Sequence, residues 1–220
     1  MFQQSGGKEM ARVSLLLVVF LVVLGCTLAI PMKSTMEAPP TTARVPLRLG
    51  VYYSPDFRNY SYTAYTWISM NWSSRGDPWV FPLGNTSARL FDRVFSDMFT
   101  SVQSLDSRPP LRGSQAKLDA VLEPKIESFD FSEPHLKEGA YTAEITYRFT
   151  LYALNGEPLA SWTVRGTGSK HRKPGFDFAS GPGEAADLAM QDAASKFIAG
   201  FPDIPEVRRL INQAKTSPPK

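Results

Sequence analysis

Side chains that commonly carry out chemistry are scarce in this chain. It has one cysteine, Cys26, and two histidines, His135 and His171. Neither histidine belongs to an H-x₃-H or H-E-x-x-H pattern, and no G-x-S-x-G nucleophile motif is present. The sequence therefore indicates no catalytic group, no metal site and no cofactor, and we expect a protein that is not an enzyme.

Carboxylates are the next chemical candidates. A pair of them could act as the acid and base of a glycosidase. The four that lie near predicted strand ends or loops are Asp130, Glu133, Asp177 and Glu184. No spacing brings any two of them together, so we expect solvated or capping roles for each.

The glycine-rich segment 166–178 contains GTGSK, Gly166 to Lys170, which is similar to part of a phosphate-binding loop. It lacks the full spacing of that motif, and it begins at the end of a predicted strand rather than between a strand and a helix. Its basic residues are therefore expected in a solvated loop, with contact to lipid phosphates as the alternative. They are Lys170, His171, Arg172 and Lys173.

Cys26 stands at the end of the longest apolar run. Lys8 and Arg12 precede that run, which extends from Val13 to Leu24. A basic start, a short apolar stretch and a small residue at its end are typical of a secretory signal, here over residues 1–25. An ordinary cleaved signal fits poorly, because the residues before Cys26 do not follow an A-x-A pattern. An uncleaved transmembrane anchor over residues 13–30 remains an alternative.

The residues VLGC, Val23 to Cys26, resemble the lipobox of bacterial lipoproteins. This resemblance implies diacylglycerol transfer to the Cys26 thiol, cleavage before Cys26 and acylation of its new amino group. Several acyl chains, at about 0.8 kcal/mol per buried methylene, would anchor the protein stably in a membrane. Thr27, in place of the Asp that signals inner-membrane retention, implies the outer membrane with the domain facing the periplasm.

The remainder of the chain is nearly neutral. Residues 1–25 hold two of the 24 Lys and Arg and one of the 21 Asp and Glu, which leaves 22 basic and 20 acidic side chains. Nucleic-acid binding therefore has no electrostatic support. Residues 26–46 form a lipidated cysteine and a flexible linker, in which 32–46 are rich in Pro and Thr. One domain follows over 47–214, and 215–220 form a disordered tail.

Periodicity predicts the elements of that domain. Leu47–Tyr53 alternates as a half-buried strand. Residues 85–105 form an amphipathic helix capped by Asn85 or Ser87. Leu118–Phe131 forms a second strand, and Pro124 predicts an edge or a bulge in it because proline cannot donate to a ladder.

Asn155-Gly156 predicts a hairpin turn within residues 141–168. A two-residue loop there sets Phe149 opposite Trp162 and Thr150 opposite Ser161, which gives one apolar and one polar face. A helix over 183–201 follows, with its buried face at Ala186, Ala189, Met190, Ala193, Phe197 and Phe201. A short helix over 203–214 ends the domain.

This order predicts an α+β fold, with an antiparallel or mixed sheet of about four to six strands and two helices packed on one face. The lipobox and the element order resemble the small envelope lipoproteins of Gram-negative bacteria, namely the YajG-type lipoproteins and the lipopolysaccharide-assembly lipoprotein. The segment GEAADLAMQDAASKF, residues 183–197, also resembles the last helix of such a family. The resemblance implies an envelope role and no particular binding residue.

Residues 52–81 contain five of the eight Tyr and three of the four Trp. We expect an inserted hairpin over about 54–82 that turns at residues 73–77. Its aromatic side chains either complete the core or form a surface for a protein partner, a glycan or an acyl chain. The candidates for such a surface are Tyr60, Tyr62, Tyr65, Trp67, Trp72 and Trp79.

The sequence thus favours a membrane-anchored periplasmic lipoprotein that binds a protein partner, in an accessory or assembly role in the cell envelope. Two alternatives stay open. One is a lipid- or glycan-binding module that uses the aromatic segment. The other is an uncleaved single-pass membrane protein with the same domain.

Overall fold

The computed structural model describes residues 28–32, 44–65, 78–111, 118–134, 139–172 and 180–216. Contacts divide the chain into two units, Met1–Leu28 with Tyr65–Trp79, and Ala29–Ala64 with Val80–Lys220. The large sheet and the helices described below belong to the second unit. Cys26, the signal residues and the turn of the inserted hairpin lie outside the described residues.

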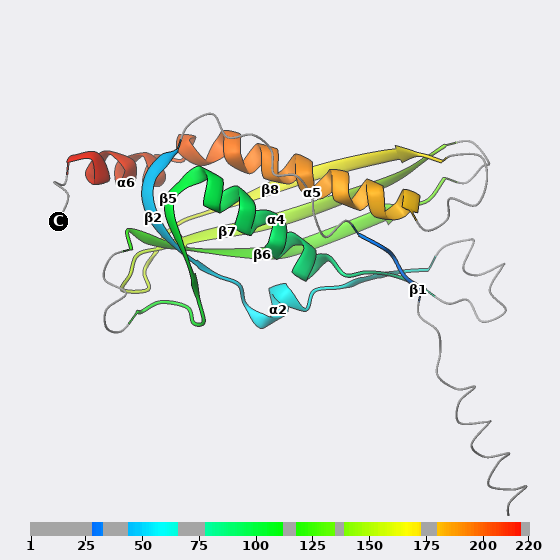
Figure 1. Ribbon diagram of the computed structural model, residues 1–220, viewed down its shortest axis with the longest axis horizontal. Coiled ribbons are helices and arrows are strands. Elements are labelled where there is room, and N and C mark those ends of the chain that lie inside the picture. Colours follow the sequence, from blue (N-terminus) through cyan, green and yellow to red (C-terminus); the bar gives the residue numbers. More distant parts are fainter. Residues whose placement is uncertain are drawn as a thin grey trace, which may run out of the picture. The chain divides into compact units, whose positions relative to one another are not determined.

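The second unit is built on a mixed five-stranded sheet (Figure 1). β2 runs parallel to its two neighbours, β5 and β6, whereas β6, β7 and β8 are antiparallel. The predicted α+β class is therefore confirmed. In spatial order the strands are β5 (Phe99–Leu105), β2 (Val45–Tyr52), β6 (Ala120–Ser132), β7 (Ala140–Tyr152) and β8 (Pro158–His171).

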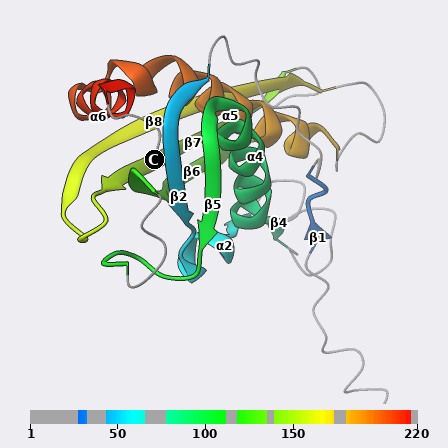
Figure 2. The same cartoon turned by 60° about the vertical axis from the view of Figure 1, so that its left-hand side comes forward.

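Two helices cover one face of this sheet, α4 (Leu83–Met98) and α5 (Ser180–Gly200) (Figure 2). The predicted apolar face is confirmed, because five of its six residues are buried on α5 and the sixth, Phe201, is buried directly after the helix ends at Gly200. A 3₁₀ turn, η1 (Phe201–Asp203), leads into α6 (Pro205–Thr216), and a four-residue helix, α2 (Pro55–Arg58), follows β2. None of the helices in the described part of the chain has the length and apolar content needed to cross a bilayer.

The helix predicted over 85–105 is wrong at both ends. It starts at Leu83 after Pro82, and neither Asn85 nor Ser87 caps it. Ser87 instead lies inside the helix and bonds the Tyr147 hydroxyl at 2.7 Å. Residues 99–105 form strand β5, because pairing with β2 satisfies the backbone groups on one side of the strand and β-branched residues such as Val102 favour an extended chain.

Strand β6 contains a bulge, but at Glu127 rather than at Pro124, where the sequence predicted an edge or a bulge. The pairing with β2 ends at Leu122, so the proline lies beyond that ladder. Glu127 is an extra residue between the pairs made by Ile126 and Ser128 with β7. Because one extra residue reverses the alternation of side chains, the bulge turns Phe129 toward the helix-covered face that Ile126 also faces.

The register predicted for the β7–β8 hairpin is confirmed, although its loop is longer than predicted. Ala153 pairs with Glu157 around a three-residue loop, and Gly156 has a φ of 94°, which glycine adopts without strain. A shift between Leu151 and Tyr152 then restores the predicted pairing. The confirmed pairs are Phe149–Trp162, Thr150–Ser161, Tyr147–Val164, Leu151–Ala160 and Arg148–Thr163.

A smaller sheet has the order β1 (Leu28–Ala29), β4 (Trp79–Phe81), β3 (Tyr62–Ala64). The folded part thus starts earlier than the predicted domain boundary at residue 47. Ile30 is only 1% exposed and its N–H donates to the Val80 carbonyl at 2.9 Å. The apolar side chain of Ile30 explains this, since its burial stabilises a segment that the prediction placed in the linker.

Candidate functional site

The face of the sheet opposite α4 and α5 carries exposed polar side chains along β6, β7 and β8. The alternation of the strands produces this face, because most of their apolar residues point toward the helices. Val121 and Tyr152 are exceptions and belong to a separate apolar cluster with Leu105 and Leu118. Its hydroxyl-bearing residues include Thr142, Thr146, Thr150, Ser161, Thr163, Thr167 and Ser169. We call the exposed side chains of these three strands the open face.

Ion pairs connect neighbouring strands on the open face. The Arg148 guanidinium bonds the Glu127 carboxylate at 2.6 Å, and Arg165 pairs with Glu144. Each arginine is at least half exposed, and exposed pairs of this kind contribute about 0–1 kcal/mol to stability. Their main effect is to hold long side chains flat across the strands.

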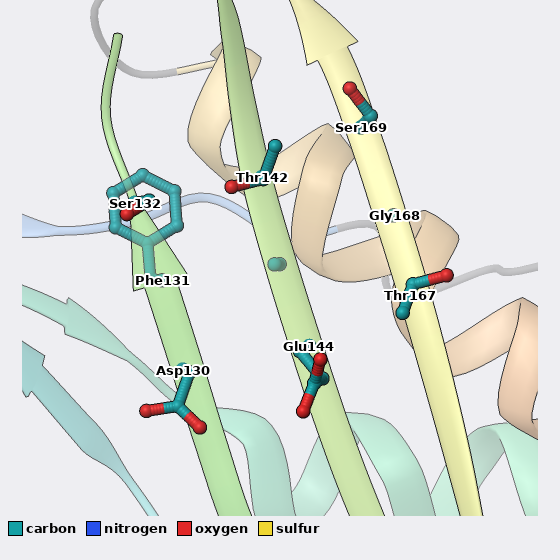
Figure 3. Close-up of a pocket in the computed structure, with 9 residues that line it drawn as sticks. Asp130, Phe131, Ser132, Thr142, Glu144, Thr167, Gly168 and Ser169 are labelled. Atoms are coloured by element: carbon teal, nitrogen blue, oxygen red, sulfur yellow. The ribbon is translucent and has the colours of Figure 1, made fainter. Parts of the chain in front are cut away.

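A shallow hollow of about 580 Å³ lies at one end of the open face (Figure 3). Asp130 and Glu144 stand directly opposite each other in the β6–β7 register, and hydroxyls of Thr142, Thr167 and Ser169 surround them. These groups can accept and donate hydrogen bonds to a polar partner. The hollow is open, and its lining is part polar and part apolar, with Phe131 and Ala143 beside the hydroxyls and carboxylates.

The groups that line the hollow can form hydrogen bonds and carry charge. Two carboxylates directly opposite on one face repel each other, and Arg165 offsets this repulsion on the Glu144 side. Within the described ranges, no group of three or more His, Cys, Asp or Glu side chains is arranged to hold a metal ion.

The carboxylates that the sequence singled out do not meet. Asp130 lies in the hollow, Glu133 follows the end of β6, and Glu184 pairs with Lys170. Asp177 lies outside the described residues, as do His135 and Lys173. The residue missed was Glu144, which the hairpin register already placed on the polar strand face; only its pairing with Asp130 needed the structure.

The GTGSK segment, predicted in a loop, is instead part of strand β8, and its glycines serve packing. A Cβ atom on Gly166 would lie 2.0 Å from the Ala189 carbonyl oxygen, and one on Gly168 would lie 2.1 Å from that of Ala185. Both glycines therefore let α5 approach the strand closely. Of the basic residues predicted in a solvated loop, Lys170 and His171 instead lie in β8, and the Lys170 ammonium pairs with the Glu184 carboxylate. The backbone N–H of Arg172 donates to the Gly139 carbonyl.

The aromatic candidates divide between interior and surface. Tyr62 is half-buried, with its ring 5.1 Å from that of Phe129 and 6.3 Å from that of Phe81. Trp79 is only 2% exposed, so its side chain is interior rather than part of a surface, whereas Tyr65 is 70% exposed. Trp67 and Trp72 lie outside the described residues.

Tyr60 is half-buried beside α4, where its carbonyl accepts the Gly84 N–H at 2.9 Å. Burial raises the pKa of the Tyr60 phenol, and the nearby groups of Tyr62 and Asp130 raise it further. Tyr60 therefore stays neutral and can offer a hydrogen bond at the surface.

Comparison with known proteins supports the fold. No family model and no curated protein matches the chain. Among solved structures, the protein XCC0632 from Xanthomonas campestris, described with the family model DUF330, is 12% identical with a TM-score of 0.52, and the match covers 86% of this chain and 99% of that one. A minor lipoprotein from Acinetobacter baumannii is 10% identical with a TM-score of 0.38, over 76% of this chain and 96% of that one. At such identities the likeness concerns architecture alone, and the first match shows that a bacterial protein of known structure shares this arrangement of sheet and helices.

Proposed function

We propose that this chain is a bacterial envelope lipoprotein, anchored by lipid on Cys26, that acts by binding a protein partner and catalyses no reaction. The observation that carries the proposal is the VLGC sequence at Val23–Cys26, which ends the apolar run and stands four residues before the buried Ile30. Thr27 favours the outer membrane, with the domain in the periplasm.

The position of Ile30 supports a close approach to the membrane. An extended chain spans at most about 3.6 Å per residue, so Ile30 lies within about 14 Å of an acylated Cys26. The same region of the domain carries the basic end of β8. A Cβ atom on Gly183 would lie 2.2 Å from the Pro31 carbonyl oxygen, and the next residue, Glu184, pairs with Lys170. Basic groups near an anionic membrane contribute about 1 kcal/mol each to its binding.

The open face supports a protein partner. It presents ion pairs, hydroxyls and a hollow of mixed polar and apolar lining, which match the mixed composition and polar contacts of non-obligate protein interfaces. Tyr62, by contrast, uses its ring to pack on Phe81 and Phe129, which leaves less of the aromatic segment for an acyl chain. The alternative is a glycan bound in the hollow, and the experiments must distinguish it from a protein partner.

Labelled palmitate tests the anchor. The wild-type protein should incorporate the label, lose residues 1–25 and fractionate with the outer membrane. Cys26→Ala should incorporate none and leave an uncleaved or wrongly cleaved product, whereas Thr27→Ala should still be labelled. A wild-type protein that takes up no label and keeps residues 1–25 would establish the transmembrane alternative.

Site-specific photo-crosslinking in intact cells tests the partner. A photoreactive residue at Thr146 or Thr163 on the open face should yield a protein adduct of higher mass. The matched control is Ser195, which is exposed on α5. Adducts only from Ser195, or none from any position, would contradict the proposed face. A lipid or glycan adduct from Thr146 would favour the ligand-binding alternative.

A further inference from the structure

The two edge strands of the large sheet, β8 and β5, differ in whether side chains bond their outward-facing backbone groups. At the β8 edge, the Asp192 carboxylate accepts the Thr167 N–H at 2.8 Å and the Lys196 ammonium donates to the Arg165 carbonyl at 3.0 Å. Asp192 and Lys196 also bond each other at 2.7 Å. Two side chains of α5 thus occupy outward backbone groups that another strand would otherwise pair with, so this edge is closed there.

In the part of the chain that the structure describes, no helix side chain bonds the outer backbone groups of β5 in this way. Among the described residues β5 pairs only with β2, and Figure 2 shows it as the near edge of the sheet. The segment Phe99–Leu105 contains no charged residue and no proline, which are the usual means of protecting an edge. Its exposed residues are Thr100, Ser101, Gln103 and Ser104.

The backbone groups of β5 that point outward follow from hydrogen bonds on the far side of β2. The N–H and the carbonyl of Arg48 both bond Asp119, on the β6 side. Backbone groups alternate along a strand, so Leu49 and Val51 point toward β5. Since Leu49 is in register with Val102, the β5 residues that bond β2 are 101, 103 and 105.

The N–H and carbonyl groups of Thr100, Val102 and Ser104 therefore face away from the sheet. This outward set is symmetric about Val102, and its members are small and uncharged. Placed antiparallel to itself, the set matches Val102 with Val102 and Thr100 with Ser104, and each match joins residues that can exchange both backbone bonds. The edge is thus complementary to a second copy of itself.

We propose that two copies of this chain associate through their β5 strands, antiparallel about a two-fold axis at Val102, to form one continuous sheet. The two helix layers then lie on the same side of that sheet, because the axis is perpendicular to it. The two open faces likewise join into a single surface of twice the length. The association does not depend on the lipid anchor.

Disulfide trapping in the full chain tests the pairing. Paired residues on antiparallel strands have Cα atoms about 5.5 Å apart, within the range that a disulfide spans. Under mild oxidation, Val102→Cys should therefore give a covalent dimer of twice the monomer mass. The matched control, Thr163→Cys, places the thiol on the other edge strand and should give none. The unmodified chain reports any contribution from Cys26.

Proline substitutions distinguish a disulfide formed by paired β5 strands from one formed by random encounters between two molecules. Adding Ser104→Pro to Val102→Cys removes an outward N–H while leaving the bonds to β2, so the covalent dimer should be lost. Adding Thr163→Pro instead removes an N–H on the β8 edge, and the dimer should persist. Equal trapping at both edges, no trapping at Val102, or a disulfide to a different protein would each overturn the proposal. A dimer found without palmitate labelling would leave it standing and refute only the anchor.

Discussion

Helices α4 and α5 lie on the same face of the sheet but pack on it by opposite means. α4 uses large rings, and the Phe91 ring lies 5.0 Å from that of Tyr147 and 5.3 Å from that of Phe149. α5 also places one ring, Phe197, 4.6 Å from that of Phe149, but from Ala185 to Ala193 it sets alanines against glycines of β8, so close that a single added Cβ would collide with the helix backbone. α4 is thus held by the volume of its rings, whereas the alanine stretch of α5 is held by its short distance from the strand.

This difference predicts opposite sensitivities. Removing atoms should harm the contact of α4, because a cavity forms where a ring was. Adding atoms should harm the contact of α5, because the backbone of a helix cannot yield as a side chain can. Substitutions at the two contacts therefore test whether the distinction holds.

The largest effect is expected at Phe91, which is fully buried among rings from three elements. Phe91→Ala should reduce the free energy of unfolding by about 3–5 kcal/mol, measured by denaturant titration. Leu188→Ala on α5, where the side chain is 41% exposed, is the control and should cost far less. A small effect at Phe91 would mean that α4 is not held by ring volume.

Gly166→Ala comes next. Its Cβ would meet the Ala189 carbonyl oxygen and the Ala193 nitrogen, so α5 must shift as a unit. We expect a loss of about 1–3 kcal/mol, seen as a lower midpoint in the same titration. Thr163→Ala, on the open face of the same strand, should change stability little. Equal denaturation midpoints for the two variants would show that stability does not require the close approach of α5 to β8.

The two helices meet at Tyr147, and its substitution is expected to have a smaller effect. Its hydroxyl bonds Ser87 of α4 at 2.7 Å, and the Ser87 hydroxyl also lies 3.3 Å from the Met190 sulfur of α5. Burial raises the pKa of Tyr147 far above its ordinary value, so the phenol stays protonated. Tyr147→Phe should cost about 0.5–1.5 kcal/mol. Phenol absorbance during alkaline titration should show Tyr147 ionising only as the protein unfolds.

The smallest effect concerns Asp192, which holds α5 to the edge of β8. Burial acts to raise the pKa of its carboxyl, but bonds from Lys196 and the Thr167 N–H outweigh burial and lower it. A group with a lowered pKa in the folded state stabilises the fold above its unfolded value, about 3.9, and loses that contribution as the pH falls further. Asp192→Asn should therefore flatten the acid limb of a plot of melting temperature against pH. Ser195→Ala on the same helix should leave that limb unchanged.

The sequence predicted best where a local signal and a long-range pattern agreed. Asn155-Gly156 fixed the turn region, and the alternation of residues 141–168 allowed only one register, so the pairing survived an error in loop length. A slip by one residue would have exposed Phe149 and buried Thr150.

The prediction failed where one pattern of apolar residues was compatible with both a helix and a strand. Phe95, Phe99 and Val102 repeat at three and four residues, which favours a continued helix, yet residues 99–105 pair with β2. Only the presence of β2 decides between them. The loop prediction for Gly166 and Gly168 fails for a similar reason. Glycines two residues apart on a strand can pack against alanines four residues apart on a helix, as they do here. This pattern can be recognised only when the strand and the helix are considered together.

The bulge at Glu127 makes the length of β6 as important as its composition. Beyond the bulge, Phe129 and Phe131 join rings of the interior, with Phe131 4.9 Å from Phe81, while Asp130 reaches the hollow. Deleting one residue there would exchange the two sets, placing a carboxylate among the rings and two phenylalanines in water. Single substitutions after the bulge therefore change one side chain each, whereas an insertion or a deletion changes both faces of the strand at once. The hollow and the aromatic cluster thus depend on the same strand length.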